Sequence, residues 1–252
     1  MSISLGTSSL ILPIGIVAAL YSAVGHGGAS GYLAVLSLLG KPANHEHVAA
    51  VALVLNILVS AISLAAYAKA GHFSLKITWP LIIASVPLAF LGGLLKLSDK
   101  AYFALLGITL LLAALRMFFF NPAPSQSILT DVSKAKIMAV GGTIGFASGV
   151  VGVGGGVFLS PLMLLLKWAD VKTTSATAAA FILVNSLAGV AARVSRGGFD
   201  VGDATPLIAS ALIGGLIGSG LGAYVLSRRA LCVVLGTVLL IASTKLLIQE
   251  VS

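Results

Sequence analysis

Long runs of apolar residues constrain the fold of this 252-residue chain more than any other feature of its sequence. Eight such runs, bounded by charge or by Pro and Gly, cover 10–39, 48–68, 77–95, 101–120, 137–167, 174–192, 204–226 and 230–248. A helix needs about 17–25 apolar residues to cross a bilayer. Because hydrophobic residues make up 58% of the chain and charged residues 9%, a water-soluble fold could not bury this much apolar surface. We therefore predict an all-α polytopic membrane protein.

The net charge of +8 does not indicate a nucleic-acid partner. Lys and Arg occur in short clusters between the apolar runs, as at Lys96/Lys100 and Arg193/Arg196. This spacing is typical of membrane helix ends, where long basic side chains reach the lipid headgroups. The single cysteine, Cys232, lies inside an apolar run and excludes a disulfide within the chain.

The first four runs align with the last four, which predicts two tandem repeats of about four helical segments each. Matched pairs include Asn56 with Asn185, Gly71 with Gly197, Pro80 with Pro206, Gly107 with Gly236, and Arg116 with Lys245. The repeats would cover 1–120 and 137–252, joined by a polar linker over 121–136. Four crossings per repeat would make the copies parallel, whereas three crossings and a re-entrant hairpin would make them inverted.

The first segment of each repeat is interrupted by glycines at matched positions. Gly25-His26-Gly27-Gly28-Ala29 aligns with Gly152-Val153-Gly154-Gly155-Gly156. Each glycine disfavours a helix interior by about 1 kcal/mol, so we expect both helices to break there. Irregular backbone at membrane depth must be buried in protein or line a watery cavity. The half-helix after each break would direct free N–H groups at that cavity and form an anion site. The alternative is close helix packing through small residues.

Polar residues near the breaks complete the candidate substrate site. His26 is the ionisable side chain placed deepest in an apolar run and is a candidate proton carrier. Asn56 and Asn185 occupy the helix after each break, where a buried amide needs a partner. The hydroxyl of Ser175 at the start of the latter helix is a further candidate contact. The predicted substrate-binding residues are Gly25, His26, Gly27, Gly28, Ser30, Asn56, Gly152, Gly154, Gly155, Gly156, Thr177 and Asn185.

The sequence contains no arrangement of side chains that indicates catalysis. We find no carboxylate pair, no nucleophile with a base and no phosphate-binding motif followed by Lys-Ser/Thr. Three consecutive residues, His45-Glu46-His47, cannot all face one metal ion. We therefore expect neither an enzyme nor a bound cofactor or metal.

Two motifs resemble a known family of membrane transporters. The segments GVVGVGGGVFLSPL (149–162) and SATAAAFILVNSLAG (175–189) are similar to motifs of the TauE/SafE family, and VGHGGASGYL (24–33) resembles the first-repeat motif of one of its branches. The resemblance implies a multi-pass protein of the bacterial or archaeal cytoplasmic membrane that moves sulfur-containing oxyanions without ATP. Family members commonly carry a glycine triplet in both halves, whereas here the first copy is Gly-Gly-Ala.

The sequence thus predicts a secondary transporter of sulfite or short organosulfonates, with proton-coupled export through His26 as one form of it. A passive channel or permease for another small anion, and a membrane-embedded accessory subunit, are the alternatives. The expected partners are the small anion and the lipid bilayer, and a homo-oligomer is left open.

Overall fold

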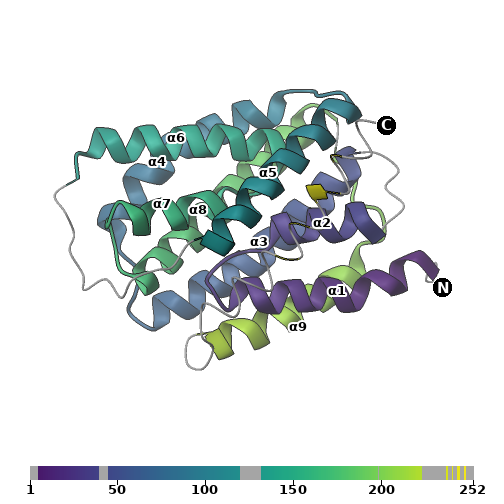
Figure 1. Ribbon diagram of the computed structural model, residues 1–252, viewed down its shortest axis with the longest axis horizontal. Coiled ribbons are helices and arrows are strands. Elements are labelled where there is room, and N and C mark those ends of the chain that lie inside the picture. The colour runs from purple at the N-terminus through teal and green to yellow at the C-terminus, as the bar shows by residue number, and fades with distance from the viewer. Residues whose placement is uncertain are drawn as a thin grey trace.

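The computed structural model describes residues 5–39, 45–119, 132–197 and 199–222, together with a few isolated positions nearer the C-terminus. Every regular element in this part of the chain is a helix (Figure 1). The helices are α1 (Leu5–Ser22), α2 (Ala29–Leu39), α3 (His45–Lys69), α4 (Leu75–Leu94), α5 (Asp99–Phe119), α6 (Lys134–Val151), α7 (Gly156–Leu165), α8 (Val171–Ser195) and α9 (Thr205–Gly222). The run predicted over 230–248, including Cys232, Gly236 and Lys245, lies outside the described residues apart from those isolated positions, and so does most of the 121–136 linker.

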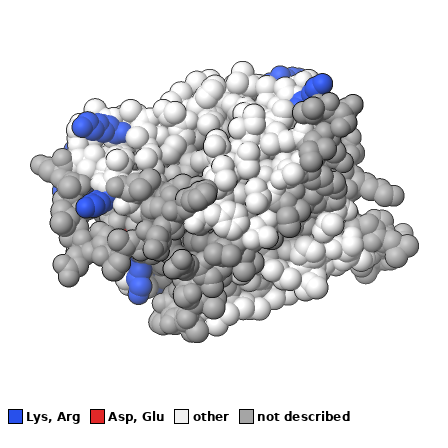
Figure 2. All heavy atoms as spheres, viewed as in Figure 1, with Lys and Arg blue, Asp and Glu red and all other residues white. Residues whose placement is uncertain are grey.

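Three of the described helices are long and apolar enough to cross a membrane: Glu46–Lys69, Leu75–Leu94 and Lys172–Ser195. Shorter apolar helices cover Ser8–Ser22, Lys100–Leu112 and Thr205–Leu221. Large hydrophobic side chains such as Leu12, Trp79 and Ile213 are exposed on the outside, where a soluble protein would rarely gather them. On the face in Figure 2, Lys and Arg lie toward the two ends of the long axis, and the described part of the surface between them carries no Lys, Arg, Asp or Glu. These features are those of a multi-pass membrane protein.

The helices pack in a row that places α3 and α8 at the centre. In Figure 1, α4 and α6 form one side of the molecule and α1 and α9 the other, with α8 packed on α4 and α3 packed on α9. Helices α3 and α8 run antiparallel, because Glu46 at the start of α3 pairs with Arg196 just after the end of α8. Asn56 and Ser186, near the middle of the same two helices, also bond to each other.

The two outer helix pairs meet along stripes of small residues. On α6, Gly141, Gly145 and Gly149 lie against the backbone of Leu81, Ser85 and Ala89 on α4. On α9, Gly214 and Gly218 lie against the backbone of Gly15 and Ala19 on α1. Spacing of four residues puts small side chains on one face, so that membrane helices approach closely and gain dispersion contacts.

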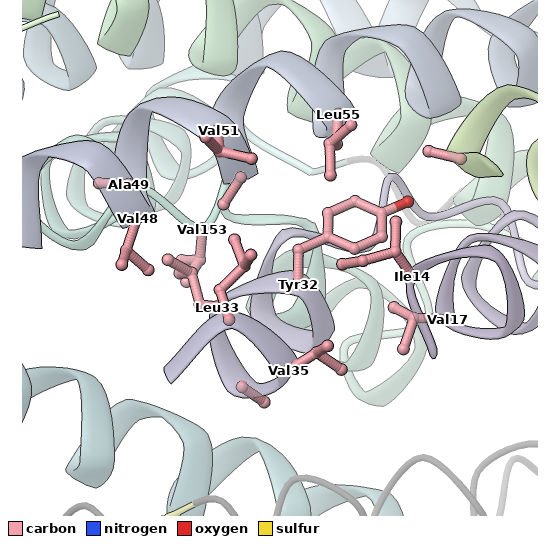
Figure 3. Close-up of a cluster of buried hydrophobic side chains, with 14 of the residues drawn as sticks. Ile14, Val17, Tyr32, Leu33, Val35, Val48, Ala49, Val51, Leu55 and Val153 are labelled. Atoms are coloured by element: carbon pink, nitrogen blue, oxygen red, sulfur yellow. The ribbon is translucent and has the colours of Figure 1, made fainter. Parts of the chain in front are cut away.

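The chain reverses direction between α1 and α2. Gly31, near the start of α2, lies against Val17 of α1, and the Tyr21 hydroxyl bonds to Ser30 at 2.8 Å. Figure 3 shows Tyr32 of α2 beside Ile14 of α1 and Leu55 of α3, with Leu33 on the opposite side, toward Val48 of α3. Val153, which belongs to the second glycine cluster, lies beside Leu33 in the same apolar core. The packing of α2 therefore brings the two glycine clusters together.

Candidate functional site

Helical structure stops at both glycine clusters. Helix α1 ends at Ser22 and α2 begins at Ala29, whereas α6 ends at Val151 and α7 begins at Gly156. In the second break Gly152, Gly154 and Gly155 all have φ between 72° and 82°, a left-handed conformation that glycine adopts without steric cost. Gly152 is the C-cap of α6 and Gly155 the N-cap of α7. We call residues 23–28 the first break and residues 152–155 the second break.

The first break carries the chain from one end of α3 to its middle. Near the end of α3, the Tyr67 hydroxyl donates to the carbonyl of Ala23 at 3.3 Å. At the start of α8, Ser175 Oγ donates to the Val24 carbonyl at 3.1 Å. The first amide of α2, at Ala29, donates to Asn56 Oδ1 at 3.0 Å in the middle of α3. Helix α2 has 11 residues, about 16 Å, and completes the return from this depth.

Asn56 links the two breaks to each other. Its Oδ1 accepts from the Ala29 amide, and its Nδ2 donates to Ser186 Oγ on α8 at 2.8 Å. The side chain is fully buried. A methyl group added at Gly27 would overlap Asn56 Oδ1, and one added at Gly154 would overlap Asn56 Nδ2. One amide therefore fills the space between the first break and the second.

His26 also joins the breaks. Its Nδ1 lies 3.0 Å from the Val24 carbonyl oxygen. Its Nε2 lies 3.2 Å from the Gly156 carbonyl oxygen and 3.1 Å from Ser160 Oγ, both on α7. A carbonyl only accepts hydrogen bonds, whereas a hydroxyl both donates and accepts. The imidazole thus faces partners for its neutral and its protonated forms.

Asn185 differs from Asn56 although the sequence matches them. Its side chain is 1% exposed, yet neither Nδ2 nor Oδ1 has a hydrogen-bond partner among the described residues. Asn185 follows Phe181 and Ile182 by one helical turn, and these two side chains touch Gly155 and Gly156. Helical side chains lean toward the preceding turn, so this amide lies on the face of α8 that covers the second break.

The three remaining candidate hydroxyls, those of Ser30, Thr177 and Ser175, each make a hydrogen bond within the protein. Ser30 bonds to Tyr21 and ties α2 to α1. Thr177 is buried, and Thr78 Oγ1 on α4 donates to its hydroxyl at 3.2 Å. Ser175 does reach the first break, through its bond to Val24.

The glycines also allow close packing, in addition to their backbone conformations. A methyl group at Gly25 would lie 2.5 Å from Ser175 Cβ, and one at Gly28 would lie 2.7 Å from the Tyr32 ring. At Gly156 it would overlap Ile182. The breaks are therefore closely surrounded by side chains in this conformation, and both of the explanations weighed for the glycines, helix breaking and close packing, describe these segments.

A buried charged cluster was missed by the sequence analysis, which placed Arg193 at the lipid headgroups. Arg193 is instead 2% exposed, and its Nε lies 3.7 Å from Glu46 Oε2. Arg196 Nη2 contacts both oxygens of Glu46, at 2.5 and 2.6 Å. Arg193 follows Ser186 and Gly189 by seven and four residues, so helical periodicity could have placed it on the face that meets the second break.

The N-terminus of α8 has its own electrostatic anchor. Asp170 Oδ1 accepts from the amides of Lys172 and Thr173 at 2.8 and 2.9 Å, and Oδ2 accepts from the Thr173 hydroxyl at 2.8 Å. Partial burial disfavours the charged carboxylate, but these hydrogen bonds outweigh it and lower the pKa of Asp170 below its usual value. The negative charge of Asp170 also interacts favourably with the positive, N-terminal end of the α8 dipole.

An apolar groove of about 740 Å³ opens between α4 and α8. Its lining includes Val86, Phe90, Leu91, Val184, Leu187 and Ala191. The groove carries no charged side chain and suits lipid chains rather than an anion. The residues that the structure describes also contain no group of three or more His, Cys, Asp or Glu side chains that could hold a metal ion.

Comparison with known proteins agrees with the membrane architecture. The family described as "Sulfite exporter TauE/SafE" matches residues 10–246. The probable membrane transporter protein y4hK of Sinorhizobium fredii (strain NBRC 101917 / NGR234) is 35% identical over 241 residues, which cover 92% of this chain and 94% of that protein. No solved structure matches the chain.

Proposed function

The chain belongs to the TauE/SafE family of membrane transporters, and on this premise we propose that it is a secondary carrier that exports a small sulfur-containing oxyanion. Sulfite and short organosulfonates are the proposed substrates, and the cytoplasmic membrane of a bacterium or archaeon is the proposed location. The observation that carries the proposal is the meeting of two broken helices on the buried amide of Asn56, midway along α3.

The proposed anion site uses backbone donors and neutral amides rather than a surface cation. Among the described residues, the backbone N–H groups of Gly154, Gly155 and Gly156 have no hydrogen-bond acceptor. A half-helix that starts at mid-depth presents such N–H groups with the positive end of its dipole. Asn185, whose amide also has no described partner, adds a donor beside them. Binding of an oxyanion would satisfy these groups, which are costly to leave buried and unpaired.

We further propose that the chain is an inverted repeat, with units 1–120 and 137–252. The first helix of each unit packs on the third segment of the other, as α1 on α9 and α6 on α4. The matched helices α3 and α8 pack on each other and run antiparallel. Matched helices that cross the membrane in opposite directions support inverted copies, an arrangement common in secondary transporters.

Side-specific labelling tests this topology. Lys76 and Asp203 are exposed near the starts of α4 and α9. In a Cys232→Ser background, Lys76→Cys and Asp203→Cys should react with an impermeant thiol reagent from opposite sides of the membrane. Labelling of both positions from the same side would contradict the inverted arrangement.

The proposed proton carrier is His26. Neutral imidazole donates Nδ1–H to the Val24 carbonyl and accepts the Ser160 hydroxyl proton at Nε2. Protonated imidazole has an N–H at Nε2 as well, which donates to the Gly156 carbonyl. Proton uptake therefore replaces the bond from the Ser160 hydroxyl with one to the Gly156 carbonyl, and so couples the charge of His26 to the contact between the first break and α7.

Flux in proteoliposomes tests the function. The purified protein should move sulfite or a short sulfonate with saturable kinetics, and a pH gradient should change the rate. Saturation separates a carrier from a channel, whose flux would rise linearly with anion concentration. The absence of flux for sulfite, short sulfonates and thiosulfate would contradict the proposed substrate class.

A further inference from the structure

Arg193 is a buried cation next to the second break. It lies in the last turn of α8, and its side chain is 2% exposed. A membrane helix normally places such a residue where it can extend into the headgroups. Burial of a guanidinium is costly unless hydrogen bonds and an opposite charge compensate it. Whether the neighbouring charges and hydrogen bonds compensate the buried guanidinium therefore indicates the role of Arg193.

The carboxylate near Arg193 is already engaged. Arg196 contacts both oxygens of Glu46 at 2.5 and 2.6 Å, whereas Arg193 Nε is 3.7 Å from the nearer oxygen. Another acidic side chain at this end, Asp200, lies 3.7 Å from His47 Nδ1 and is largely exposed. Among the described residues, two guanidiniums thus share one carboxylate, which leaves an excess of positive charge inside the protein.

The hydrogen bonds of Arg193 are also incomplete. Its Nε has no hydrogen-bond partner in the described part of the chain. Its Nη1 makes a long bond of 3.4 Å to the carbonyl of Gly189 on its own helix. The nearby Tyr102 hydroxyl donates to the Val151 carbonyl at 2.9 Å. A buried guanidinium with unused donors and excess charge indicates a missing anionic partner.

The space beside the guanidinium is less crowded than the rest of the breaks. A methyl group at Gly152 would lie 3.4 Å from Arg193 Nη2, and one at Gly189 would lie 3.7 Å from Nη1. Both are ordinary contact distances. At Gly27, Gly154 and Gly156 an added methyl would instead overlap a neighbouring side chain. The two glycines therefore approach the guanidinium without the overlap that an added methyl would cause elsewhere in the breaks.

We propose that Arg193 binds the transported oxyanion, as the charged part of a site formed with Gly152 and Gly189 on the side of the second break nearer the end of α8. This inference rests on the proposed transport function and adds a cationic side chain to a site otherwise made of neutral donors. A guanidinium forms paired, charge-assisted hydrogen bonds to the oxygens of sulfite or a sulfonate. The excess charge also favours anions over neutral solutes.

The experiment compares Arg193→Gln with Arg196→Gln, which removes the same charge from a guanidinium that already has a carboxylate partner. Two signals are measured for sulfite: the anion-dependent rise in Tm of the purified protein in detergent, and KM and Vmax in proteoliposomes. Arg193→Gln should raise KM about tenfold or more and abolish the rise in Tm, because a charge-assisted contact is lost. Arg193→Lys should recover part of the affinity, and Arg196→Gln, which frees Glu46 to pair with Arg193, should raise KM less than Arg193→Gln does.

A second variant keeps the test valid if Arg193→Gln does not fold. Gly189→Ala adds a methyl beside the guanidinium, at ordinary contact distances and in a helix that tolerates alanine. It should raise KM severalfold while the Tm without anion stays equal or increases. Wild-type KM in both Arg193→Gln and Gly189→Ala would overturn the inference and leave the proposed function standing. Absence of both signals in the wild-type protein would contradict the proposed function itself, and this inference with it.

Discussion

The two glycine breaks have similar sequences but different hydrogen bonding. In the first break, the amide that starts the half-helix is bonded to Asn56, and Asn56 is bonded in turn to Ser186. In the second break, the matched asparagine, Asn185, is equally buried but has no described hydrogen-bond partner. The first break carries the titratable His26, and the second has Val153 at that position but lies beside Arg193.

This difference suggests a division of labour between the copies. The asparagine of the first break is bonded within the protein and holds the helices around it, although the amides of Gly27 and Gly28 there also lack a described acceptor. A break with unused buried donors next to a guanidinium is destabilised until an anion supplies acceptors. If the proposed function holds, more of the binding energy for an oxyanion is expected at the second break, while the first break carries the proposed proton carrier, His26.

The largest expected loss of stability comes from adding a methyl group where a break packs against the Asn56 side chain. Gly154→Ala combines a left-handed φ of 72° with overlap at Asn56 Nδ2, and should reduce the free energy of unfolding by about 3 kcal/mol. Gly71→Ala is the control, since its φ is 79° but nothing lies within 4 Å of the added methyl. It should cost about 1 kcal/mol. Unfolding of the purified protein in detergent measures both, and equal losses would contradict the packing on Asn56.

The next comparison replaces each matched asparagine by leucine, which has a similar volume. Asn56→Leu leaves the Ala29 amide and the Ser186 hydroxyl unpaired, and should cost about 2–3 kcal/mol of stability. Asn185→Leu removes an amide without described partners and should change stability by less than about 1 kcal/mol. Sulfite transport should fall in Asn185→Leu despite its normal stability. Equal destabilisation by the two variants would show that the breaks are equivalent after all.

His26→Gln tests the asymmetry in proton chemistry. Glutamine keeps hydrogen-bonding groups in the space between Val24 and Gly156 but does not bind a proton. Stability should fall by about 1 kcal/mol, and anion flux should continue without any response to an imposed pH gradient. Flux that still follows the gradient would exclude His26 as the proton carrier. Ser160→Ala, which removes only the hydroxyl partner of Nε2, is the matched control for loss of a hydrogen bond.

The smallest expected effect concerns the start of α8, the helix that covers the second break. Asp170→Ala should cost about 1 kcal/mol at pH 7, since it removes the N-cap of the helix. Because hydrogen bonds lower the pKa of Asp170 in the folded protein, its stabilisation is present above the usual carboxyl pKa of about 3.9. It is lost as the pH falls through the lowered, folded-state value. A variant whose deficit stays constant down to pH 3 would contradict this role.

Much of the fold could be predicted from the sequence. Glycine clusters in apolar runs predicted the two helix breaks, because glycine disfavours a helix interior whatever surrounds it. Gly214 and Gly218 contact α1 through the four-residue spacing that lets membrane helices approach closely. Thr177 was predicted at the anion site, and in the structure its hydroxyl accepts a hydrogen bond from Thr78 on α4. Arg193 was expected at the headgroups and is buried.

The sequence by itself determined that this chain crosses a membrane and where its helices stop, because hydrophobicity and backbone preference are local properties of the residues. It also predicted which positions correspond in the two halves. Only the tertiary structure decided which matched residues differ in role, since Asn56 finds Ser186 and Ala29 while Asn185 finds no described partner. The pairing of Glu46 with Arg196, which leaves Arg193 with excess charge, joins residues 150 positions apart. Hydrogen bonding and charge balance depend on such distant neighbours, and no local pattern records them.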